Sequence, residues 1–383
     1  MSLPEPGAEA LAHSQRLVAQ LRQQIDAAGG WIPFAQFMRL ALYAPALGYY
    51  SAGAHKLGAA GDFVTAPEIS PLFAQALARP LAQTLAASGG DILELGPGSG
   101  SLARQLLLEL AALDHLPKRY CLLEVSPDLR QRQEHALADL PPDLARRCTW
   151  LDALPERFAG VIFGNEVLDA LPVEIVRRDG DAFWQRGVSY DAAGRFQWSD
   201  RALHRGALFE AARERLPEGA CLAEINLEGE ALVVSLGRRL ERGLLLLLDY
   251  GYPRAEYYHP QRSTGTLQCF YRHRVHDDVF FLPGLQDITA HVDFTAMAEA
   301  GADSGLELAG YTSQAQFLLN CGVLDALQRT GEPGSLAYLE AANGLNRLLS
   351  PAEMGEIVKV MAWTRAIEFM PAGFETGNRL HRL

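Results

Sequence analysis

The sequence predicts an α/β protein built on a mostly parallel seven-stranded sheet with helices on both faces. Two observations support this fold class. From residue 91 onward, short apolar segments alternate with amphipathic ones, which is typical of βαβ units. The first apolar segment also leads directly into a glycine-rich turn and then a helix. The expected strands are 91–95, 119–125, 148–151, 159–164, 243–250, 306–312 and 358–365.

A helical region is expected before the sheet. An amphipathic helix over 10–28 ends at a pair of glycines, which are strong helix terminators. A short helix and a longer one follow at 33–42 and 70–87. Residues 48–62 between them are rich in glycine and aromatic residues and lack periodicity, so we interpret them as a functional loop.

The rest of the chain returns to the α/β pattern after one interruption. The strand at 243–250 is the most apolar, so we expect it near the centre of the sheet. Residues 173–205 alternate with period 2 around glycine turns, which indicates an inserted antiparallel meander. Residues 251–291 are irregular and are interpreted as a lid facing the substrate. The remaining helices are expected at 102–113, 127–138, 228–241, 293–300 and 313–349.

Composition and charge argue against several classes of protein. The chain of 383 residues has a formal net charge of -12, so it repels phosphate backbones and no nucleic-acid partner is expected. The longest apolar run is too short to span a membrane, and no secretory signal or transit peptide is apparent, so we expect a cytoplasmic protein. Its 5 cysteines are dispersed, which fits free thiols better than a disulfide framework or a zinc site.

The glycine-rich turn is the first candidate site. Glu94, Gly96, Gly98 and Gly100 join a buried strand to a helix, where glycines let the backbone pass close to a ligand. A dinucleotide fingerprint needs a further glycine at the position of Ser101, which disfavours NAD(P). S-adenosyl-L-methionine has no phosphate and carries a cationic end that favours the Glu94 carboxylate. The turn therefore favours S-adenosyl-L-methionine, with a purely structural tight turn as the alternative.

Two more acidic residues follow the next two strands. Glu124 ends the second strand, where its carboxylate can accept hydrogen bonds from both ribose hydroxyls. Asp152 ends the third strand and can accept from the adenine amino group, with Ala153 packing on the ring. Either acid alone is also compatible with a helix N-cap. The ordered set of glycines and acids on three successive strands is more specific to a cofactor site than any member.

The segment after the fourth strand is the candidate methyl-transfer site. Methyl transfer is an in-line displacement at a sulfonium, which needs positioning and electrostatics more than acid–base chemistry. A guanidinium acceptor stays charged at neutral pH, so carboxylates are needed to hold it and to take its proton. Glu166, Asp169 and Asp249 are the catalytic candidates, and Asn165 and Glu166 are cofactor-binding candidates. The alternatives are that Asp169 caps a helix or that Asn165 and Glu166 bind only the cofactor.

The irregular segment carries the candidate substrate residues. Its histidines and aspartates lack a tight ligand spacing such as HExxH, so no metal site is expected. A loop rich in His, Tyr and Arg at the strand ends is more typical of substrate contact. The residues chosen are Tyr252, His259, His291 and Asp293.

Taken together, these segments resemble the MidA family of S-adenosyl-L-methionine-dependent methyltransferases, which includes the mitochondrial complex I assembly methyltransferase. The resemblance extends from about residue 33 to residue 365. Its most specific parts are GDFVTAPEIS at 61–70 and GNEVLDALP at 164–172. The other matching segments are 37–43, 48–50, 94–100, 248–252 and 287–293.

The resemblance implies a Rossmann-like class I methyltransferase with an N-terminal helical part and inserted substrate elements. It implies that residues 61–70 fold over the cofactor, with Thr65, Pro67, Glu68 and Ser70 near it. It also implies arginine methylation of a protein substrate, with a respiratory complex I subunit as one candidate. The expected domains are 1–88 (helical, with the cofactor-covering loop), 89–172 with 243–383 (cofactor-binding), and 173–242 (an inserted substrate element).

Other functions stay open at this point. A methyltransferase acting on a small molecule is one, although the broad lid favours a large substrate. A non-catalytic assembly or chaperone protein that binds S-adenosyl-L-methionine is another, although the intact acidic residues at 166, 169 and 249 argue against it. An NAD(P) oxidoreductase is disfavoured by Ser101 and Glu94. The oligomeric state is open, and a homodimer is among the expectations.

Overall fold

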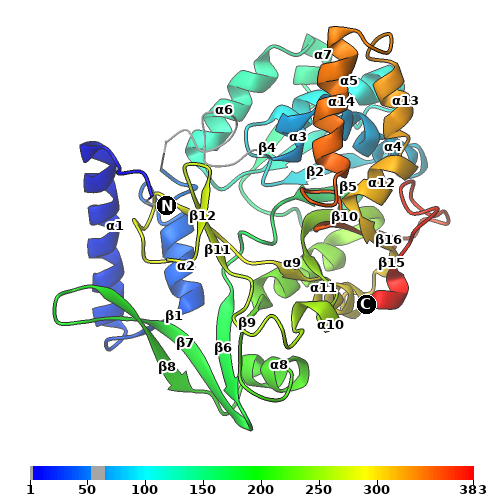
Figure 1. Cartoon of the computed structure of the whole chain (residues 1–383). Coiled ribbons are helices and arrows are strands. Elements are labelled where there is room, and N and C mark those ends of the chain that lie inside the picture. The colour runs from blue at the N-terminus through cyan, green and yellow to red at the C-terminus, as the bar shows by residue number, and fades with distance from the viewer. Residues whose placement is uncertain (1–2, 53–64) are drawn as a thin grey trace. The chain divides into compact units, whose positions relative to one another are not determined.

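The computed structural model describes residues 3–52 and 65–383, and contacts divide the chain into two compact units (Figure 1). Unit 1 comprises Met1–Phe63, Leu168–Glu230 and Tyr252–Asp293, and unit 2 comprises Val64–Val167, Ala231–Gly251 and Phe294–Leu383. The three expected domains stay a prediction.

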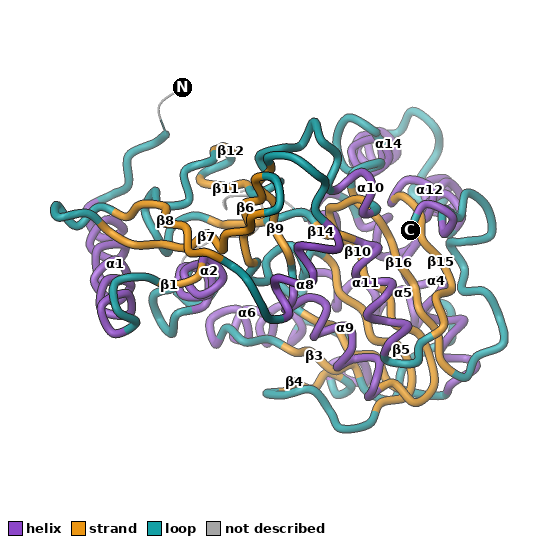
Figure 2. Tube along the Cα trace, turned by 90° about the horizontal axis from the view of Figure 1, so that it is seen from below, coloured by secondary structure: helices purple, strands orange, loops and turns teal. Residues whose placement is uncertain are grey.

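The strands of unit 2 form one sheet in the order β15-β16-β10-β5-β2-β3-β4. Figure 2 shows β10, β16 and β15 following one another within this unit. All seven predicted strands are present, and β10 is central, pairing with β5 and β16 through a fully buried leucine run. The bounds are β2 Asp91–Leu95, β3 Tyr120–Leu123, β4 Cys148–Leu151, β5 Phe158–Asn165, β10 Leu240–Tyr252, β15 Glu307–Ser313 and β16 Val358–Arg365.

The sheet is mixed, which corrects the expectation of a mostly parallel one in one respect. Strands β4, β3, β2, β5 and β10 pair in parallel, but β16 runs antiparallel to both β10 and β15. A fully buried strand has the same apolar sequence pattern in either direction, so direction could not be inferred from it.

The strand order reverses at β2. From β2 the chain continues through β3 to β4 on one side, and then returns to β5 and β10 on the other. In open α/β sheets, ligands bind at such a switch point, beyond the carboxyl ends of the strands. The loops that follow β2 and β5 are therefore the place to look for a site.

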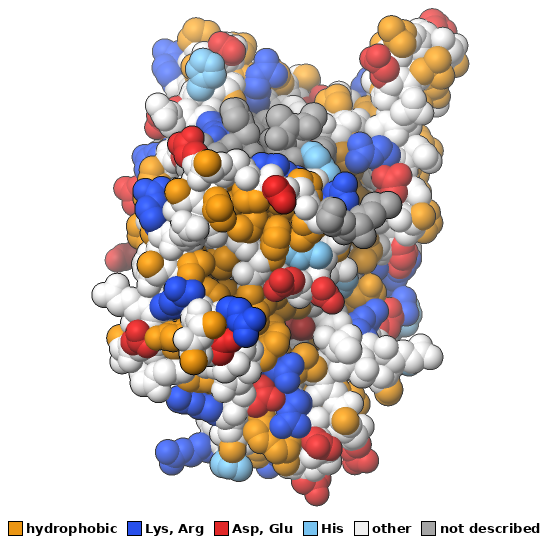
Figure 3. Space-filling model, turned by 60° about the vertical axis from the view of Figure 1, so that its left-hand side comes forward, with side chains coloured by type: hydrophobic (Ala, Val, Ile, Leu, Met, Phe, Trp, Pro, Cys, Tyr) orange, Lys and Arg blue, Asp and Glu red, His pale blue; other side chains and the backbone are white. Residues whose placement is uncertain are grey.

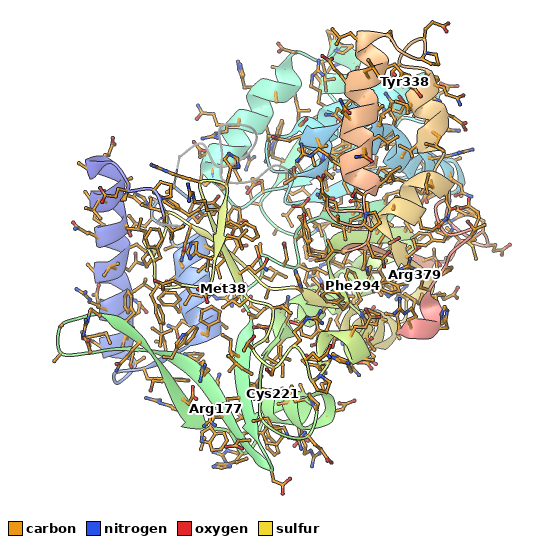
Figure 4. The ribbon with its side chains drawn as sticks, viewed as in Figure 1. Met38, Arg177, Cys221, Phe294, Tyr338 and Arg379 are labelled. Carbon is orange, nitrogen blue, oxygen red and sulfur yellow. The ribbon has the colours of Figure 1, made fainter. Side chains whose placement is uncertain are left out.

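Helices cover both faces of this sheet (Figure 1). On one face, apolar side chains of several helices pack with alternate strand residues in a single buried cluster. On the other, Gly301 of α11 lies against Trp363 of β16, and Phe294 packs 5.4 Å from Tyr311 (Figure 4). The helices on the first face are α4 Pro71–Ser88, α5 Ser101–Ala112, α12 Gln314–Asn320, α13 Val323–Gln328 and α14 Leu336–Leu349, and those on the second face are α9 Leu227–Arg239 and α11 Phe294–Asp303. The unit also contains α6 Pro127–Ala138 and the short helices α3 Ala66–Ile69, α7 Pro142–Ala145 and η1 Leu380–Arg382.

Unit 1 contains the predicted meander. Strands β6, β7 and β8 pair antiparallel as expected, and β1 and β9 extend the sheet. Helices α1 and α2 supply apolar side chains such as Met38 (Figure 4) to the core beside it. The bounds are α1 Ala8–Ala27, β1 Ile32–Pro33, α2 Phe34–Tyr43, β6 Glu174–Asp179, β7 Ala182–Tyr190, β8 Phe196–Ala202, α8 Ala207–Arg215, β9 Cys221–Ile225, α10 Arg254–Tyr257 and β14 Val292–Asp293.

The segment expected to be irregular contains a second small sheet in unit 1. Strands β11 (Gln268–Tyr271), β12 (Arg274–His276) and β13 (Asp287–Thr289) pair antiparallel in the order β12-β11-β13. Strands of three or four residues are too short for a period-2 signal to stand out in the sequence.

Among the described residues, no helix has both the length and the hydropathy of a membrane-crossing segment.

Gly160 marks a very close contact between β2 and β5. Its φ is +127°, and a Cβ there would lie 2.0 Å from the carbonyl oxygen of Asp91. Because that neighbour is backbone, a side chain at residue 160 would force the two central strands apart.

We expect Gly160→Ala to lower the free energy of unfolding by about 3 kcal/mol, since backbone strain and overpacking act together. Gly89→Asn is the matched control. Gly89 has a φ of +60°, a Cβ there would have no neighbour within 4 Å, and asparagine tolerates this conformation. Urea unfolding of both variants measures the difference, and equal stabilities would contradict the close contact.

Candidate active site

The glycine-rich loop after β2 has left-handed backbone at three positions. The φ angles are +56° at Gly96, +54° at Gly98 and +80° at Gly100, which precedes α5 as its N-cap. Side chains would also be crowded, because a Cβ on Gly96 would lie 3.3 Å from a methyl group of Val167. The loop therefore exposes backbone rather than side chains at the switch point.

Glu94 is buried beneath this loop. Its side chain is 3% exposed, and the Tyr120 hydroxyl donates to its Oε2 at 2.7 Å. Burial, helped by the charge of Glu124, raises the pKa of Glu94 to about 8 against the lowering effect of the Tyr120 hydrogen bond. In the absence of a ligand, Glu94 is therefore mostly protonated at neutral pH.

Glu124 follows β3 and is only partly buried. Its Oε1 accepts from the Ser126 N–H at 2.8 Å, and its Oε2 accepts from Gln133 Nε2 at 3.0 Å. Burial raises the pKa of Glu124, while these hydrogen bonds lower it. The N-cap of α6 is Ser126, so Glu124 does not cap that helix through its own position. The next residue, Val125, is 72% exposed, which is unusual for a valine.

Asp152 and Ala153 lie exposed after β4. The Asp152 carboxylate accepts from Arg130 of α6 at 2.8 Å. No helix begins at Asp152 in the described structure, so the alternative that it is an N-cap is wrong. Both residues stay cofactor-binding candidates.

The segment 65–70 reaches the glycine-rich loop. Ser99 donates to Glu68 Oε1 at 2.8 Å, and Gln105 donates to the carbonyl oxygen of Pro67 at 3.2 Å. Thr65 is the N-cap residue of α3, and Ser70 caps α4 by accepting from the Leu72 N–H. Residues 61–64, which belong to the same expected cover over the cofactor, lie outside the described residues.

The tip after β5 is held in a strained conformation. Glu166 has a φ of +54°, which is uncommon for a residue with a side chain. Its N–H donates to the Leu248 carbonyl oxygen at 2.8 Å, and the Val167 N–H donates to Asp249 Oδ2 at 3.0 Å. Asn165 donates to Glu166 Oε1 at 3.0 Å. Strand β10 therefore fixes the backbone of Glu166. Asn165, which pairs with β10, orients the Glu166 side chain.

Asp249 is 1% exposed and lies near the carboxyl end of β10. Its Oδ2 accepts from Val167, and its Oδ1 accepts from the Tyr250 N–H at 2.9 Å. Both carboxylate oxygens thus bind backbone. Asp169, seven per cent exposed in unit 1, lies in a turn rather than at a helix start, and its carbonyl oxygen accepts from the Ala290 N–H at 3.0 Å. The helix-cap alternative for Asp169 is therefore wrong.

Among the substrate candidates of unit 1, Tyr252 and His291 lie together, with ring centroids 5.4 Å apart. Arg262 lies over the Tyr252 ring at 4.1 Å. Asp293 is buried and pairs with Arg254 at 3.4 Å. His259 is exposed, and its ring accepts from the Gln261 N–H at 3.3 Å within the turn 259–262.

Three residues of this region were not inferred from the sequence: Tyr120, Val125 and Gln133. Tyr120 lies beneath Glu94, and Val125 is the exposed residue beside Glu124. Gln133 had a detectable signal, because it falls between Leu129 and Leu137 on the buried stripe of α6 and is itself fully buried. A glutamine on an apolar stripe indicates a buried polar contact.

The arrangement fits S-adenosyl-L-methionine on its own chemistry. The loop backbone is bare, two acidic residues lie at adjacent strand ends, and Asn165 Oδ1 is buried without a hydrogen-bond partner in the described structure. An unpaired buried acceptor suits the ammonium group of an amino-acid moiety. Within the described ranges, no group of three His, Cys, Asp or Glu side chains could hold a metal ion.

Residues 73–312 match a protein-family model described as "Putative S-adenosyl-L-methionine-dependent methyltransferase". The chain belongs to this family. The methyltransferase is 30% identical to the mitochondrial protein arginine methyltransferase NDUFAF7 of Danio rerio, over 90% of this chain and 85% of that protein. It is also 30% identical to the Drosophila melanogaster homolog, over 94% of this chain and 87% of that protein. The resemblance to the MidA family is thereby confirmed.

A crystal structure from Burkholderia thailandensis supports the fold and the cofactor of the methyltransferase. That protein is bound to S-adenosyl-homocysteine and is 49% identical to this chain, with a TM-score of 0.96 and coverage of 100% of both chains. A second structure from the same organism is 50% identical with a TM-score of 0.92. The methyltransferase therefore has the α/β methyltransferase fold and uses S-adenosyl-L-methionine as its cofactor.

We expect the affinity of the methyltransferase for S-adenosyl-L-methionine to rise between about pH 6 and about pH 7.5, by up to about tenfold per pH unit. The pKa of Glu94 near 8 means that the carboxyl group must lose a proton before it can face the cationic end of the ligand. Binding at neutral pH should release a proton, which calorimetry in two buffers of different ionisation enthalpy will count.

Two variants test whether Glu94 causes this pH dependence of the affinity. Glu94→Gln should bind weakly with a flatter pH dependence, whereas Glu134→Gln removes the same charge from an exposed position on α6 and should behave as wild type. A wild-type affinity independent of pH would show that Glu94 does not face the cation.

Proposed function

We propose that this methyltransferase transfers methyl groups to arginine side chains of a protein. The observation that carries the proposal is a pair of acidic residues, Glu166 directly after β5 and Asp249 near the carboxyl end of β10. They lie on the side of the sheet where the parallel strands end and the glycine-rich loop begins. The names of the relatives support it, since both curated proteins described above are protein arginine methyltransferases. A respiratory complex I subunit is the first acceptor to test, because the resemblance to the family implies it.

In this proposal, four groups of side chains hold the cofactor. Glu124 accepts from the ribose hydroxyls, and Glu94 and Asn165 face the amino-acid end. Asp152 and Ala153 contact the adenine. Thr65, Pro67, Glu68 and Ser70 cover the ligand beside the bare backbone of Gly96, Gly98 and Gly100. When bound, S-adenosyl-L-methionine supplies an electrophilic methyl group on its sulfonium.

Glu166 is the residue proposed to hold the acceptor. Its Oε1 accepts from Asn165 at 3.0 Å, and in this proposal the carboxylate also receives a guanidinium N–H and then its proton. The left-handed backbone fixed by β10 sets the direction of this side chain. Such pre-set geometry is what an in-line displacement requires from the protein, since the methyl group, sulfur and attacking nitrogen must align.

Further acceptor contacts are proposed in unit 1. Tyr252 and His291 form an aromatic pair with Arg262 stacked on it, and Asp169, His259 and Asp293 supply polar groups on the same unit. Glu166, Asp169 and Asp249 stay the catalytic candidates of the proposal. Basic and acidic side chains are interspersed over the face shown in Figure 3, which is compatible with a protein acceptor.

We expect purified enzyme and labelled S-adenosyl-L-methionine to label protein in an extract from cells that lack the enzyme, with methylarginine found by mass spectrometry. Glu166→Gln should lower the rate about 100-fold or more, because the acceptor loses both its anchor and its proton acceptor. The affinity for S-adenosyl-homocysteine should change little. Glu134→Gln on α6 is the control and should label normally.

The same assay separates the alternatives. Label found only in small molecules would identify a small-molecule methyltransferase and sink the arginine proposal. No transfer at all, together with full genetic complementation by Gly98→Val, which fills the loop, would instead favour an assembly protein that does not catalyse. A purified complex I subunit is tested as the methyl acceptor in the same assay.

Asp249 allows a sharper test, because both of its oxygens bind backbone N–H groups. If its part is to hold the tip of β5, Asp249→Asn should keep more activity than Asp249→Glu, since asparagine retains an acceptor at the same distance. We expect this order, with about a tenfold loss for asparagine, because its amide nitrogen cannot accept and one of the two hydrogen bonds is lost. The reverse order in the rate of methyl transfer would show that Asp249 handles a proton.

A further inference from the structure

Gln133 connects three parts of the cofactor site through a single amide. It lies on α6 and is fully buried. Its Nε2 donates to the carbonyl oxygen of Gly98 at 2.9 Å and to Glu124 Oε2 at 3.0 Å. Its Oε1 accepts from the indole Nε1 of Trp150 at 2.9 Å. One side chain thus joins the glycine-rich loop, the end of β3 and strand β4.

The hydrogen-bond chemistry of the neighbours fixes the orientation of this amide. An indole nitrogen can only donate, so the oxygen of Gln133 must face Trp150. The two amide protons then meet two acceptors, the Gly98 carbonyl oxygen and the Glu124 carboxylate. Turning the amide over would place N–H against N–H and oxygen against oxygen, so a single orientation is strongly preferred.

Packing fixes the position of Gln133 as firmly as its hydrogen bonds fix its orientation. A Cβ on Gly100 would lie 3.2 Å from the Cα of Gln133, so α6 and the loop are in direct contact. Leu129 and Leu137 anchor the same stripe of the helix in the core. The Ser126 N–H at the start of α6 holds the other oxygen of Glu124. Both oxygens of Glu124 are therefore oriented by α6.

We propose that Gln133 is a positioning residue that sets the orientation of Glu124 relative to the glycine-rich loop and so determines the preference for ligands with an intact ribose diol. This proposal rests on the ribose role proposed above for Glu124. A carboxylate can bind two adjacent hydroxyls only when its plane is correctly turned, and the contacts of Gln133 with Gly98 and Glu124 fix that plane against the loop.

The charge state of Glu124 depends on the same contact. Burial raises the pKa of Glu124, and the hydrogen bonds of Ser126 and Gln133 lower it. Loss of the Gln133 amide should therefore raise the pKa further. Two other charged groups lie near Glu124. The first is Glu94 on β2, whose pKa is raised in part by the charge of Glu124, and the second is the ion pair between Arg130 of α6 and Asp152 after β4.

The test measures binding of 5′-methylthioadenosine by calorimetry across neutral pH. This probe has the ribose and adenine but lacks the amino-acid end that Glu94 is proposed to face, so titration of Glu94 affects it least. The full-length single variants are Gln133→Met, Gln133→Glu, Trp150→Phe and Glu124→Ala. A double variant combines Gln133→Met with Glu124→Ala. Gln133→Glu keeps an acceptor for Trp150 and removes both donors once its carboxyl group ionises, and it stands in for Gln133→Met if that variant does not fold.

We expect Gln133→Met to weaken binding about tenfold or more below neutral pH, with partial recovery as the pH rises and Glu124 ionises. Gln133→Glu should instead bind more weakly as the pH rises, because its own carboxylate then ionises beside Glu124. Trp150→Phe should weaken it by about threefold at most, because both donors of Gln133 remain. In the double variant, Gln133→Met should add nothing to the effect of Glu124→Ala.

Two results would overturn the proposal in distinguishable ways. An equal loss at every pH that adds to that of Glu124→Ala would mean that Gln133 only supports the fold. Unchanged binding in Glu124→Ala would remove the ribose role of Glu124 itself, and the part of Gln133 with it.

Discussion

The register of the parallel strands determines where the site segments after β2, β3, β4 and β5 begin. Leu95 of β2 lies opposite Leu123 of β3 and Gly164 of β5, and Leu123 lies opposite Leu151 of β4. The residue after each of these positions starts a site segment: Gly96, Glu124, Asn165 and Asp152. Hydrogen bonds between neighbouring strands hold these four positions in line, and a slip of one residue would turn the side chains of a strand to the opposite face of the sheet. The positions of the acidic residues are thus a property of the sheet rather than of each loop.

This register explains how much of the molecule could be read from the sequence. The seven strands of unit 2 were predictable because each is a distinct apolar run, and Glu124 and Asp152 were found because they follow such runs. The direction of β16 was not predictable, since burial on both faces leaves the same pattern either way. Short strands such as β9 and β11 gain their hydrogen bonds from partners distant in the chain, and so carry little local signal.

The site itself was predictable at the level of residue type but not of contacts. Glu94 was expected to carry a negative charge, yet its burial against Tyr120 makes the neutral form dominant without a ligand. Asp249 was expected to be catalytic, and that role stays a prediction, but its two oxygens bind the backbone of Val167 and Tyr250. Both facts depend on which strands are neighbours, which no local pattern encodes. The stripe position of Gln133 is the exception, because α6 alone reveals it.

Two buried polar groups of unit 2 share one arrangement: a side chain on one element binds the backbone of a segment that follows another. Gln133 binds the Gly98 carbonyl oxygen, and Asp249 binds the Val167 N–H. Burying such groups is costly compared with an apolar core unless every hydrogen bond is made. The strained φ of Glu166 adds to that cost. Methyl transfer gives a physical reason for accepting it, since a reaction that depends on alignment gains from loops whose backbone is fixed before the substrate arrives.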